Sequence, residues 1–111
     1  MILKTLAAAA AFACTLALPA FAAVDAEAAI KLNKDSGCTK CHSVDKAKKG
    51  PAYQKTAAKF KGKADAEAKL VDLLTKSPKV KMEDGTEEEH KAVATKDAAQ
   101  VKNLAQWILS Q

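Results

Sequence analysis

Hydrophobic positions along residues 23–111 recur at the spacing of short amphipathic helices, and polar, lysine-rich loops separate them. A first helix is predicted over residues 26–35, because Asp25 is a good N-cap and Gly37 follows its end. We expect the apolar side of this helix to comprise Ala29, Ile30 and Leu32.

Two more short helices are predicted in the middle of the chain. One spans residues 53–60 and ends before Gly62, which interrupts the helical pattern. The other begins at Asp65 and ends at Ser77-Pro78, since proline cannot continue a helix. Their apolar sides comprise Tyr53, Ala57 and Phe60 in the first helix, and Leu70, Leu73 and Leu74 in the second.

A final helix is predicted at the C-terminus. It begins near Asp97, which forms with Gln100 a pattern similar to a capping box. Residues 79–95, before it, show no regular period, and we expect an irregular loop there. Because no alternating strand pattern, repeat or linker is found, the sequence indicates one all-α domain. The buried stripe of the last helix is expected to comprise Val101, Leu104, Ala105 and Ile108, with Trp107 beside it.

The N-terminal segment differs from the rest of the chain. Residues 5–24 carry no charge, and Ala20-Phe21-Ala22 has small residues at both specificity positions of a secretory cleavage site. We therefore expect residues 1–22 to be a cleaved secretory signal peptide, and residues 23–111 to form the mature domain. The alternative is an uncleaved anchor, because about 20 apolar residues are enough to span a bilayer.

The expected mature domain has few large hydrophobic side chains. Of its 89 residues, 36 are apolar, but 16 of these are alanine and two are cysteine, so only 18 larger ones remain. A small domain with so thin a core usually needs a bound group or a cross-link to be stable.

The positive charge of the chain comes entirely from lysine. The expected mature domain has 17 lysines against 13 acidic residues, which gives a net charge of +4. Nucleic acid is a poor partner, because the chain has no arginine and only one Trp and one Tyr to stack on bases. The lysines either form an ordinary solvated surface or steer an acidic redox protein to a docking face.

The chemistry of the sequence is concentrated in Cys38-Thr39-Lys40-Cys41-His42. Two cysteines three positions apart can add to the two vinyl groups of a haem, and His42 can then bind the iron. Structural zinc fits less well, since it needs four ligands and would take all the cysteines and histidines of the mature domain, with His90 48 residues from His42 in a carboxylate-rich loop. A thioredoxin-like pair would need a βαβ context, and a structural disulfide would leave His42 without a role. The motif therefore predicts one covalently attached haem.

With this motif, the chain resembles the small bacterial class I cytochromes c in the order and spacing of several segments. These are Gly37-Cys38-Thr39-Lys40-Cys41-His42, Gly50-Pro51-Ala52-Tyr53, Ala57-Ala58-Lys59-Phe60, Ala66-Glu67-Ala68 with Leu70, and Leu104-Ala105-Gln106-Trp107-Ile108-Leu109-Ser110. The resemblance implies an all-α class I cytochrome c fold, in which about four short helices wrap one covalently bound haem. That haem would supply the missing part of the core.

The resemblance also implies roles for residues outside the attachment motif. The backbone carbonyl of Pro51 would accept a hydrogen bond from the second ring N–H of His42 and so fix its tautomer, although a turn proline is an alternative. Tyr53 and Trp107 would contact the haem or its propionates, or belong to the core. The exposed haem edge would lie near a group of lysines, which are therefore the candidates for the docking face and comprise Lys40, Lys46, Lys48, Lys49 and Lys55.

The sixth iron ligand is not set by the attachment motif. Such cytochromes usually supply a methionine from the loop before the last helix, and two candidates lie in this part of the chain. His90 precedes Trp107 by 17 residues, which resembles the usual spacing, whereas Met82 precedes it by 25 residues. We predict that His42 and His90 bind the iron, with Met82 as the alternative sixth ligand.

Together these expectations describe a soluble, monomeric, periplasmic cytochrome c that carries single electrons between redox proteins. We expect heme c as its cofactor and no contact with membranes after signal cleavage. An enzyme is not expected, because no paired catalytic acid and base is found. Two alternatives are a haem protein that binds diatomic gases through a displaceable ligand, and a haem subunit of a larger oxidoreductase.

Overall fold

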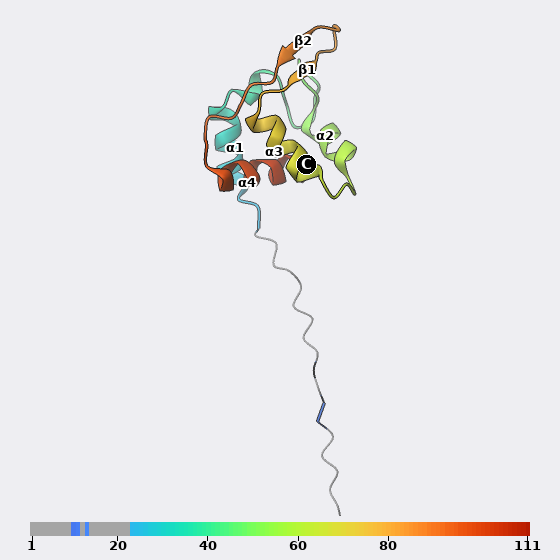
Figure 1. Ribbon diagram of the computed structural model, residues 1–111, viewed down its shortest axis with the longest axis vertical. Helices are drawn as coiled ribbons and strands as arrows, with labels where there is room; N and C mark the ends of the chain where they lie inside the picture. The colour runs from blue at the N-terminus through green and yellow to red at the C-terminus, as the bar shows by residue number, and fades with distance from the viewer. Residues whose placement is uncertain (1–9, 12, 14–22) are drawn as a thin grey trace, which may run out of the picture.

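The computed structural model describes residues 10, 11, 13 and 23–111 of the chain. Almost all of the predicted signal peptide lies outside this part, so its cleavage stays a prediction. None of the helices described is long and apolar enough to cross a membrane. The elements of residues 23–111 (Figure 1) are α1 (Ala26–Asp35), the 3₁₀-helix η1 (Cys38–Lys40), α2 (Tyr53–Phe60), α3 (Ala66–Thr75), β1 (Lys79–Lys81), β2 (Glu87–Glu89) and α4 (Ala98–Leu109).

The four predicted helices are present, and local capping explains where two of them begin. Asp25 accepts a hydrogen bond from a backbone N–H in the first turn of α1, at 3.1 Å. Asp97 accepts two such bonds in the first turn of α4, at 2.9 and 3.2 Å. After α1, Gly37 has a left-handed φ of 74°, which turns the chain into η1. Short-range interactions are therefore enough to set these boundaries.

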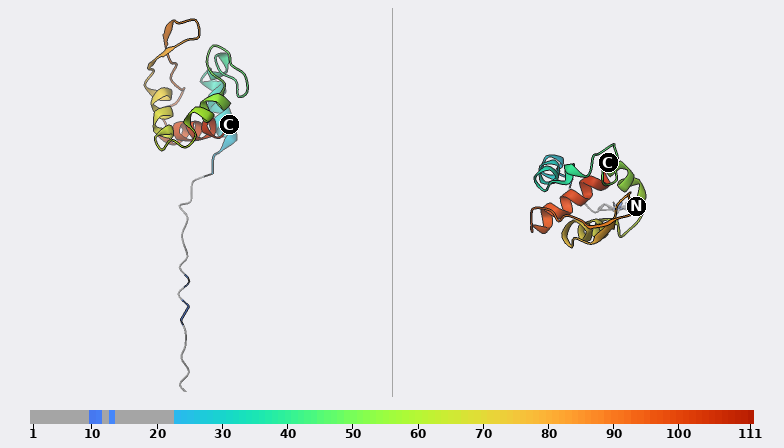
Figure 2. Two further views of the ribbon diagram at one scale, coloured as in Figure 1. Left: turned by 90° about the vertical axis from the view of Figure 1, so that its right-hand side faces the viewer. Right: turned by 90° about the horizontal axis from the view of Figure 1, so that it is seen from above.

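Helix α4 is the centre of the core and packs against α1, α2 and α3 (Figure 2). Leu104 and Ala105 have no exposed surface, which shows that this helix is covered on its apolar side. Trp107, expected beside the apolar stripe, is itself buried with 8% of its surface exposed. The buried core comprises Ala29, Tyr53, Leu70, Leu74, Val101, Leu104, Ala105, Trp107 and Ile108.

The predicted apolar side of α1 is confirmed for Ala29, which is 1% exposed, and for Leu32, which packs against the core. Ile30 is 52% exposed, so its assignment to the apolar side is wrong. The positions that are buried, Ala29, Asn33 and Ser36, follow an i, i+4, i+7 spacing, and two of them are polar. Hydrophobicity alone did not indicate Asn33 and Ser36, because these polar side chains are buried through their hydrogen bonds.

The two ends of the described domain are joined by a reciprocal pair of hydrogen bonds between α4 and the residue before α1. The backbone N–H of Asp25 donates to Oδ1 of Asn103 at 2.9 Å, and Nδ2 of Asn103 donates to the Asp25 carbonyl at 2.8 Å. These bonds connect residues 78 positions apart and fix how α1 meets α4.

The segment expected to be an irregular loop contains a β-hairpin, so that expectation is wrong for residues 79–89. The strands are antiparallel and pair Lys79 with Glu89, Val80 with Glu88 and Lys81 with Glu87. Opposite charges that face each other across two strands are favourable. The hairpin was not predicted because its strands consist mainly of lysine and glutamate and contain no run of large hydrophobic residues.

Candidate functional site

The two cysteines of the attachment motif lie on one tight turn. The backbone N–H groups of Cys41 and His42 both donate to the carbonyl of Cys38, at 3.1 and 2.9 Å. Within the described part of the chain neither cysteine forms a disulfide, and both are partly exposed. Burial raises the pKa of the Cys38 thiol above its ordinary value. Two accessible thiols on the same turn are suited to bonding one ligand at two points.

The imidazole of His42 is held by the Gly50-Pro51 pair. Its Nδ1 lies 2.7 Å from the carbonyl oxygen of Pro51, which can only accept a hydrogen bond. Nδ1 therefore donates, and the neutral ring keeps a free lone pair on Nε2. The backbone N–H of Gly50 donates to the Cys41 carbonyl at 2.8 Å, which ties this pair to the motif. The geometry presents Nε2 of His42 as a metal ligand.

His90 lies beside His42. The two ring centroids are 6.1 Å apart, and the ring planes are inclined by 46°. Nδ1 of His90 is buried and has no hydrogen-bond partner among residues 23–111, although buried polar atoms are usually paired. Burial, and then the nearby His42, lower the pKa of His90, so its ring is neutral at pH 7.

The position of His90 is set by hydrogen bonds from three different parts of the fold. Residues 90–94 lie between the base of the hairpin, the end of α3 and the residue that follows α1. The three bonds run from the His90 N–H to the Pro78 carbonyl at 2.8 Å, from the Val93 N–H to the Leu74 carbonyl at 2.9 Å, and from the Ala94 N–H to Ser36 Oγ at 2.9 Å. Long-range contacts therefore bring this histidine to the site.

Met82 lies at the other end of the hairpin from His90. Its N–H donates to the carbonyl of Thr86 at 2.7 Å, and its carbonyl accepts from Gly85 at 3.0 Å, so it is part of the turn. Pro78 pairs with His90 at the base of the hairpin, four residues earlier. At about 3.3 Å per strand residue, Met82 lies roughly 13 Å along the hairpin from Pro78. The structure thus brings His90 to His42 and leaves Met82 at the turn.

Tyr53 and Trp107 form a row of aromatic rings with His42. The rings of Tyr53 and His42 stack, with centroids 5.2 Å apart and planes 23° apart. Trp107 meets the edge of Tyr53 at 5.8 Å and 79°. The Tyr53 hydroxyl donates to Oδ1 of Asn33 at 2.5 Å. Burial, and then the charge of Cys38, raise the pKa of Tyr53, so its hydroxyl stays protonated.

Comparison with known proteins decides the family. The sequence model of the family described as Cytochrome c matches residues 26–111, which include all the site residues above. The chain belongs to the cytochrome c family. It is 39% identical over 80 residues to cytochrome c-551 of Pseudomonas aeruginosa, a match that covers 72% of this chain and 73% of that relative.

Solved structures place this cytochrome among the class I proteins. The class 1 cytochrome MtoD from Sideroxydans lithotrophicus ES-1 is 52% identical with a TM-score of 0.76, and the match covers 79% of this chain and 97% of that one. Cytochrome c552 of Nitrosomonas europaea is 31% identical with a TM-score of 0.57, over 78% and 98% of the two chains. The predicted class I cytochrome c fold is therefore confirmed.

The same comparisons confirm the predicted function. The relatives are small bacterial cytochromes c that carry electrons, and this cytochrome likewise transfers electrons between redox proteins. They give no support to the alternative of a gas-binding haem protein. Membership of the family also implies a covalently bound haem c.

The residues present fit such a haem. Two imidazoles that bind one metal from opposite sides, with metal–nitrogen bonds of about 2 Å, have centroids roughly 6 Å apart. The separation of 6.1 Å between the rings of His42 and His90 agrees with this value. Nδ1 of His90, which is buried without a partner among the described residues, also fits a ring that lies against a bound group such as a haem.

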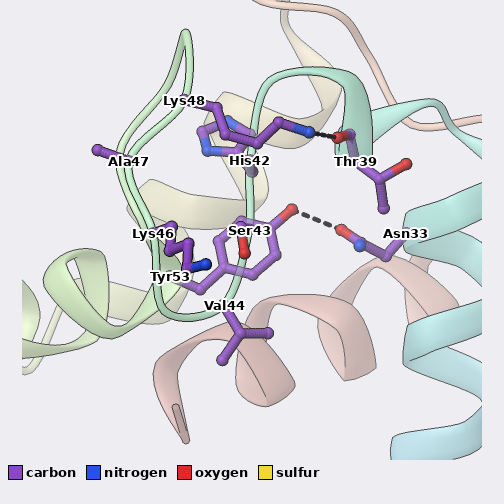
Figure 3. A pocket seen from close by; sticks show the side chains of 9 residues that line it. All are labelled: Asn33, Thr39, His42, Ser43, Val44, Lys46, Ala47, Lys48 and Tyr53. Carbon is purple, nitrogen blue, oxygen red and sulfur yellow. Dashed lines mark hydrogen bonds between the residues drawn. The ribbon is translucent and has the colours of Figure 1, made fainter.

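A cavity of about 530 Å³ lies beside His42 and Tyr53 (Figure 3). The loop of residues 43–50 forms one of its walls, and Asn33 on α1 lies across from that loop. Lys46 and Lys48 also line the cavity, and Lys48 donates to the carbonyl of Thr39 at 2.5 Å. The five lysines of the predicted docking face are all exposed, and within residues 23–111 none of them forms an ion pair.

Two polar residues that help to build the site were not predicted from the sequence. Asn33 and Ser36 are 6% and 2% exposed, and they bond Tyr53 and the backbone of Ala94. The signal that could have found them is their spacing, three residues apart on the same side of a helix as Ala29. A search for large hydrophobic residues passes over such positions.

Proposed function

We propose that this cytochrome is a periplasmic, monomeric electron shuttle whose haem c is attached through Cys38 and Cys41 and bound by His42 and His90. The observation that carries the ligation is the placement of the two imidazole rings, 6.1 Å apart between their centroids. The Cys-x-x-Cys-His turn supports the attachment, because both thiols lie beside the first ligand.

When bound, the haem supplies a one-electron iron couple, and the protein residues hold its ligands in place. The Pro51 carbonyl keeps the proton on Nδ1 of His42 and makes Nε2 a better electron donor. The low pKa of His90 keeps its ring neutral and able to bind a metal at pH 7. Neither ligand needs to gain or lose a proton, and the proposed role involves no substrate turnover.

Covalent attachment is tested by extraction with acidified acetone. The exported wild-type protein should keep its haem in this solvent. A variant with Cys38→Ala and Cys41→Ala should yield chain without bound haem. Extraction of the colour from the wild type would contradict the attachment.

The sixth ligand is tested by spectra of two variants. With His90 as ligand, the oxidised protein lacks a sulfur-to-iron charge-transfer band, and Met82→Leu stays low-spin. His90→Ala should open the site to carbon monoxide in the reduced state. A sulfur band in the wild type that disappears in Met82→Leu would assign the ligand to Met82.

The periplasmic location is supported by the uncharged segment of residues 5–24 and the small residues at 20 and 22. Mass spectrometry of the protein isolated from its native cells should show a chain that begins at Ala23. An intact N-terminus in the membrane fraction would show that the segment is an anchor. Analytical ultracentrifugation of the same sample tests the oligomeric state, and the sedimenting mass should be that of one chain.

A further inference from the structure

The ring of Tyr53 is the side chain that stacks on the proposed iron ligand His42. The two planes are 23° apart and the centroids are 5.2 Å apart. A change in the tilt of one ring therefore alters its stacking contact with the other ring. The ring of His90 lies 6.1 Å from the ring of His42, but no residue of the 90–94 segment lines the cavity next to Tyr53.

The first constraint on Tyr53 is packing, since this residue is 5% exposed and belongs to the buried core. Trp107 contacts it edge-on at 5.8 Å, but the cavity of about 530 Å³ borders both Tyr53 and His42.

The second constraint on Tyr53 is a buried hydrogen bond. Its hydroxyl donates to Oδ1 of Asn33 at 2.5 Å, and the two residues are 5% and 6% exposed (Figure 3). An asparagine on the buried side of a helix is costly unless its polar atoms are paired. An apolar residue would fill this position of α1 more cheaply if the position served packing alone.

We propose that Asn33 is a positioning residue that acts on His42 through Tyr53. By holding the hydroxyl, Asn33 fixes the plane of the Tyr53 ring, and that ring fixes the rotation of the His42 imidazole about its bond to the iron. Pro51 sets the tautomer of the ligand, and the Asn33–Tyr53 pair sets its orientation. This inference rests on the proposed ligation by His42.

The test compares variants that break the same bond from either side. Tyr53→Phe keeps the ring and removes the hydroxyl, and Asn33→Leu keeps the branch at Cγ and removes the acceptor. Both should shift the g-values of the oxidised protein in electron paramagnetic resonance and reorder its haem methyl resonances in NMR. The shifts should be the same in both variants and in the double variant, because one interaction is lost in all three.

Two further variants separate positioning from general stability. Asn33→Asp retains an acceptor oxygen for the hydroxyl and, unlike Asn33→Leu, should keep the wild-type g-values. Asn103→Leu makes the same exchange at a different contact, the one between α4 and the residue before α1, and should lower stability without moving the g-values. If Asn33→Leu does not fold, Tyr53→Phe alone decides the outcome.

Wild-type g-values and haem methyl shifts in Tyr53→Phe would overturn the proposal. So would a shift in Asn103→Leu as large as that in Asn33→Leu, since the effect would then be one of stability. Failure of the ligation itself is recognised separately: the ring protons of His42 in the wild-type protein would then lack the large shifts of an iron ligand.

Discussion

Gly50 lies so close to His42 that a β-carbon at position 50 would be 2.4 Å from Cε1 of the imidazole. The next residue, Pro51, accepts the hydrogen bond from Nδ1 at 2.7 Å. Two adjacent residues thus set where the ring lies and which nitrogen carries the proton. Glycine is required at position 50 by this close approach.

Gly50→Ala should displace the His42 ring and weaken its bond to Pro51. We expect less haem per chain, and a loss of about 1–3 kcal/mol in the free energy of unfolding, which is typical of overpacking. Haem content and denaturant unfolding measure the two effects.

The matched control for this change is Gly62→Ala. Gly62 has a φ of 76°, and a β-carbon at this position would have nothing within 4 Å, so alanine there is strained without touching the site. It should cost about 1–2 kcal/mol through the left-handed backbone alone and leave the spectrum unchanged. Equal haem content in Gly50→Ala and Gly62→Ala would contradict the role of the close approach.

Charge reversal on the lysine-rich loop should slow electron transfer to an acidic partner. Changing Lys46, Lys48 and Lys49 to glutamate alters the net charge of residues 23–111 from +4 to −2. We expect the association rate at low ionic strength to fall by about tenfold or more, because charged faces steer encounter. Stopped-flow measurements over a range of salt concentrations test this, and the difference should vanish at high salt.

The control for that prediction makes the same change of charge elsewhere. Lys59, Lys61 and Lys63 are exposed at the end of α2 and in the turn after it. Their reversal should slow the reaction less, because they lie away from the loop of residues 43–50. Equal slowing by both triple variants would indicate that net charge alone matters and that no docking face exists.

Asn103→Ala should weaken the contact between the two ends of the described domain. The change removes both hydrogen bonds to Asp25 and is expected to lower the free energy of unfolding by about 1–2 kcal/mol. The absorption spectrum should not change, because neither residue touches His42 or His90. Chemical denaturation followed by circular dichroism measures the loss, and an unchanged midpoint would show that the pair adds no stability.

Thr86 should control the titration of Asp84 in the turn of the hairpin. The hydroxyl of Thr86, and then its backbone N–H, donate to Asp84 Oδ1 and hold the pKa of this carboxyl below its ordinary value. A depressed pKa means that the interaction favours the folded turn above the unfolded-state pKa. It is lost as the pH falls through the folded-state value.

The measurement is an NMR titration of the side-chain carboxyl carbons. Thr86→Val should raise the pKa of Asp84 towards its ordinary value. The pKa of Asp65, which Lys69 lowers, should stay the same in this variant. A pKa of Asp84 that does not respond would show that Thr86 is not the cause of its shift.

Local interactions determined what could be predicted from sequence. The caps Asp25 and Asp97, the breaks at Gly37 and Gly62 and the helical spacing of the leucines act within a few residues, so the four helices were predicted correctly. The Cys38-to-His42 motif is also local, and the hydrogen bond from His42 to Pro51 spans only nine positions. These features follow from backbone geometry and side-chain chemistry that no distant contact needs to supply.

Tertiary structure decided which polar residues in and after α1 are buried and which residue lies beside His42. Asn33 is buried because Tyr53, 20 positions away, bonds it, and Ser36 because Ala94, 58 positions away, does. His90 reaches His42 because the charge-paired hairpin takes up residues 79–89, including Met82, and returns the chain to Pro78. The sequence offered His90 and Met82 as sixth ligands, and only the paired backbone determined that His90 lies beside His42 and Met82 at the turn of the hairpin.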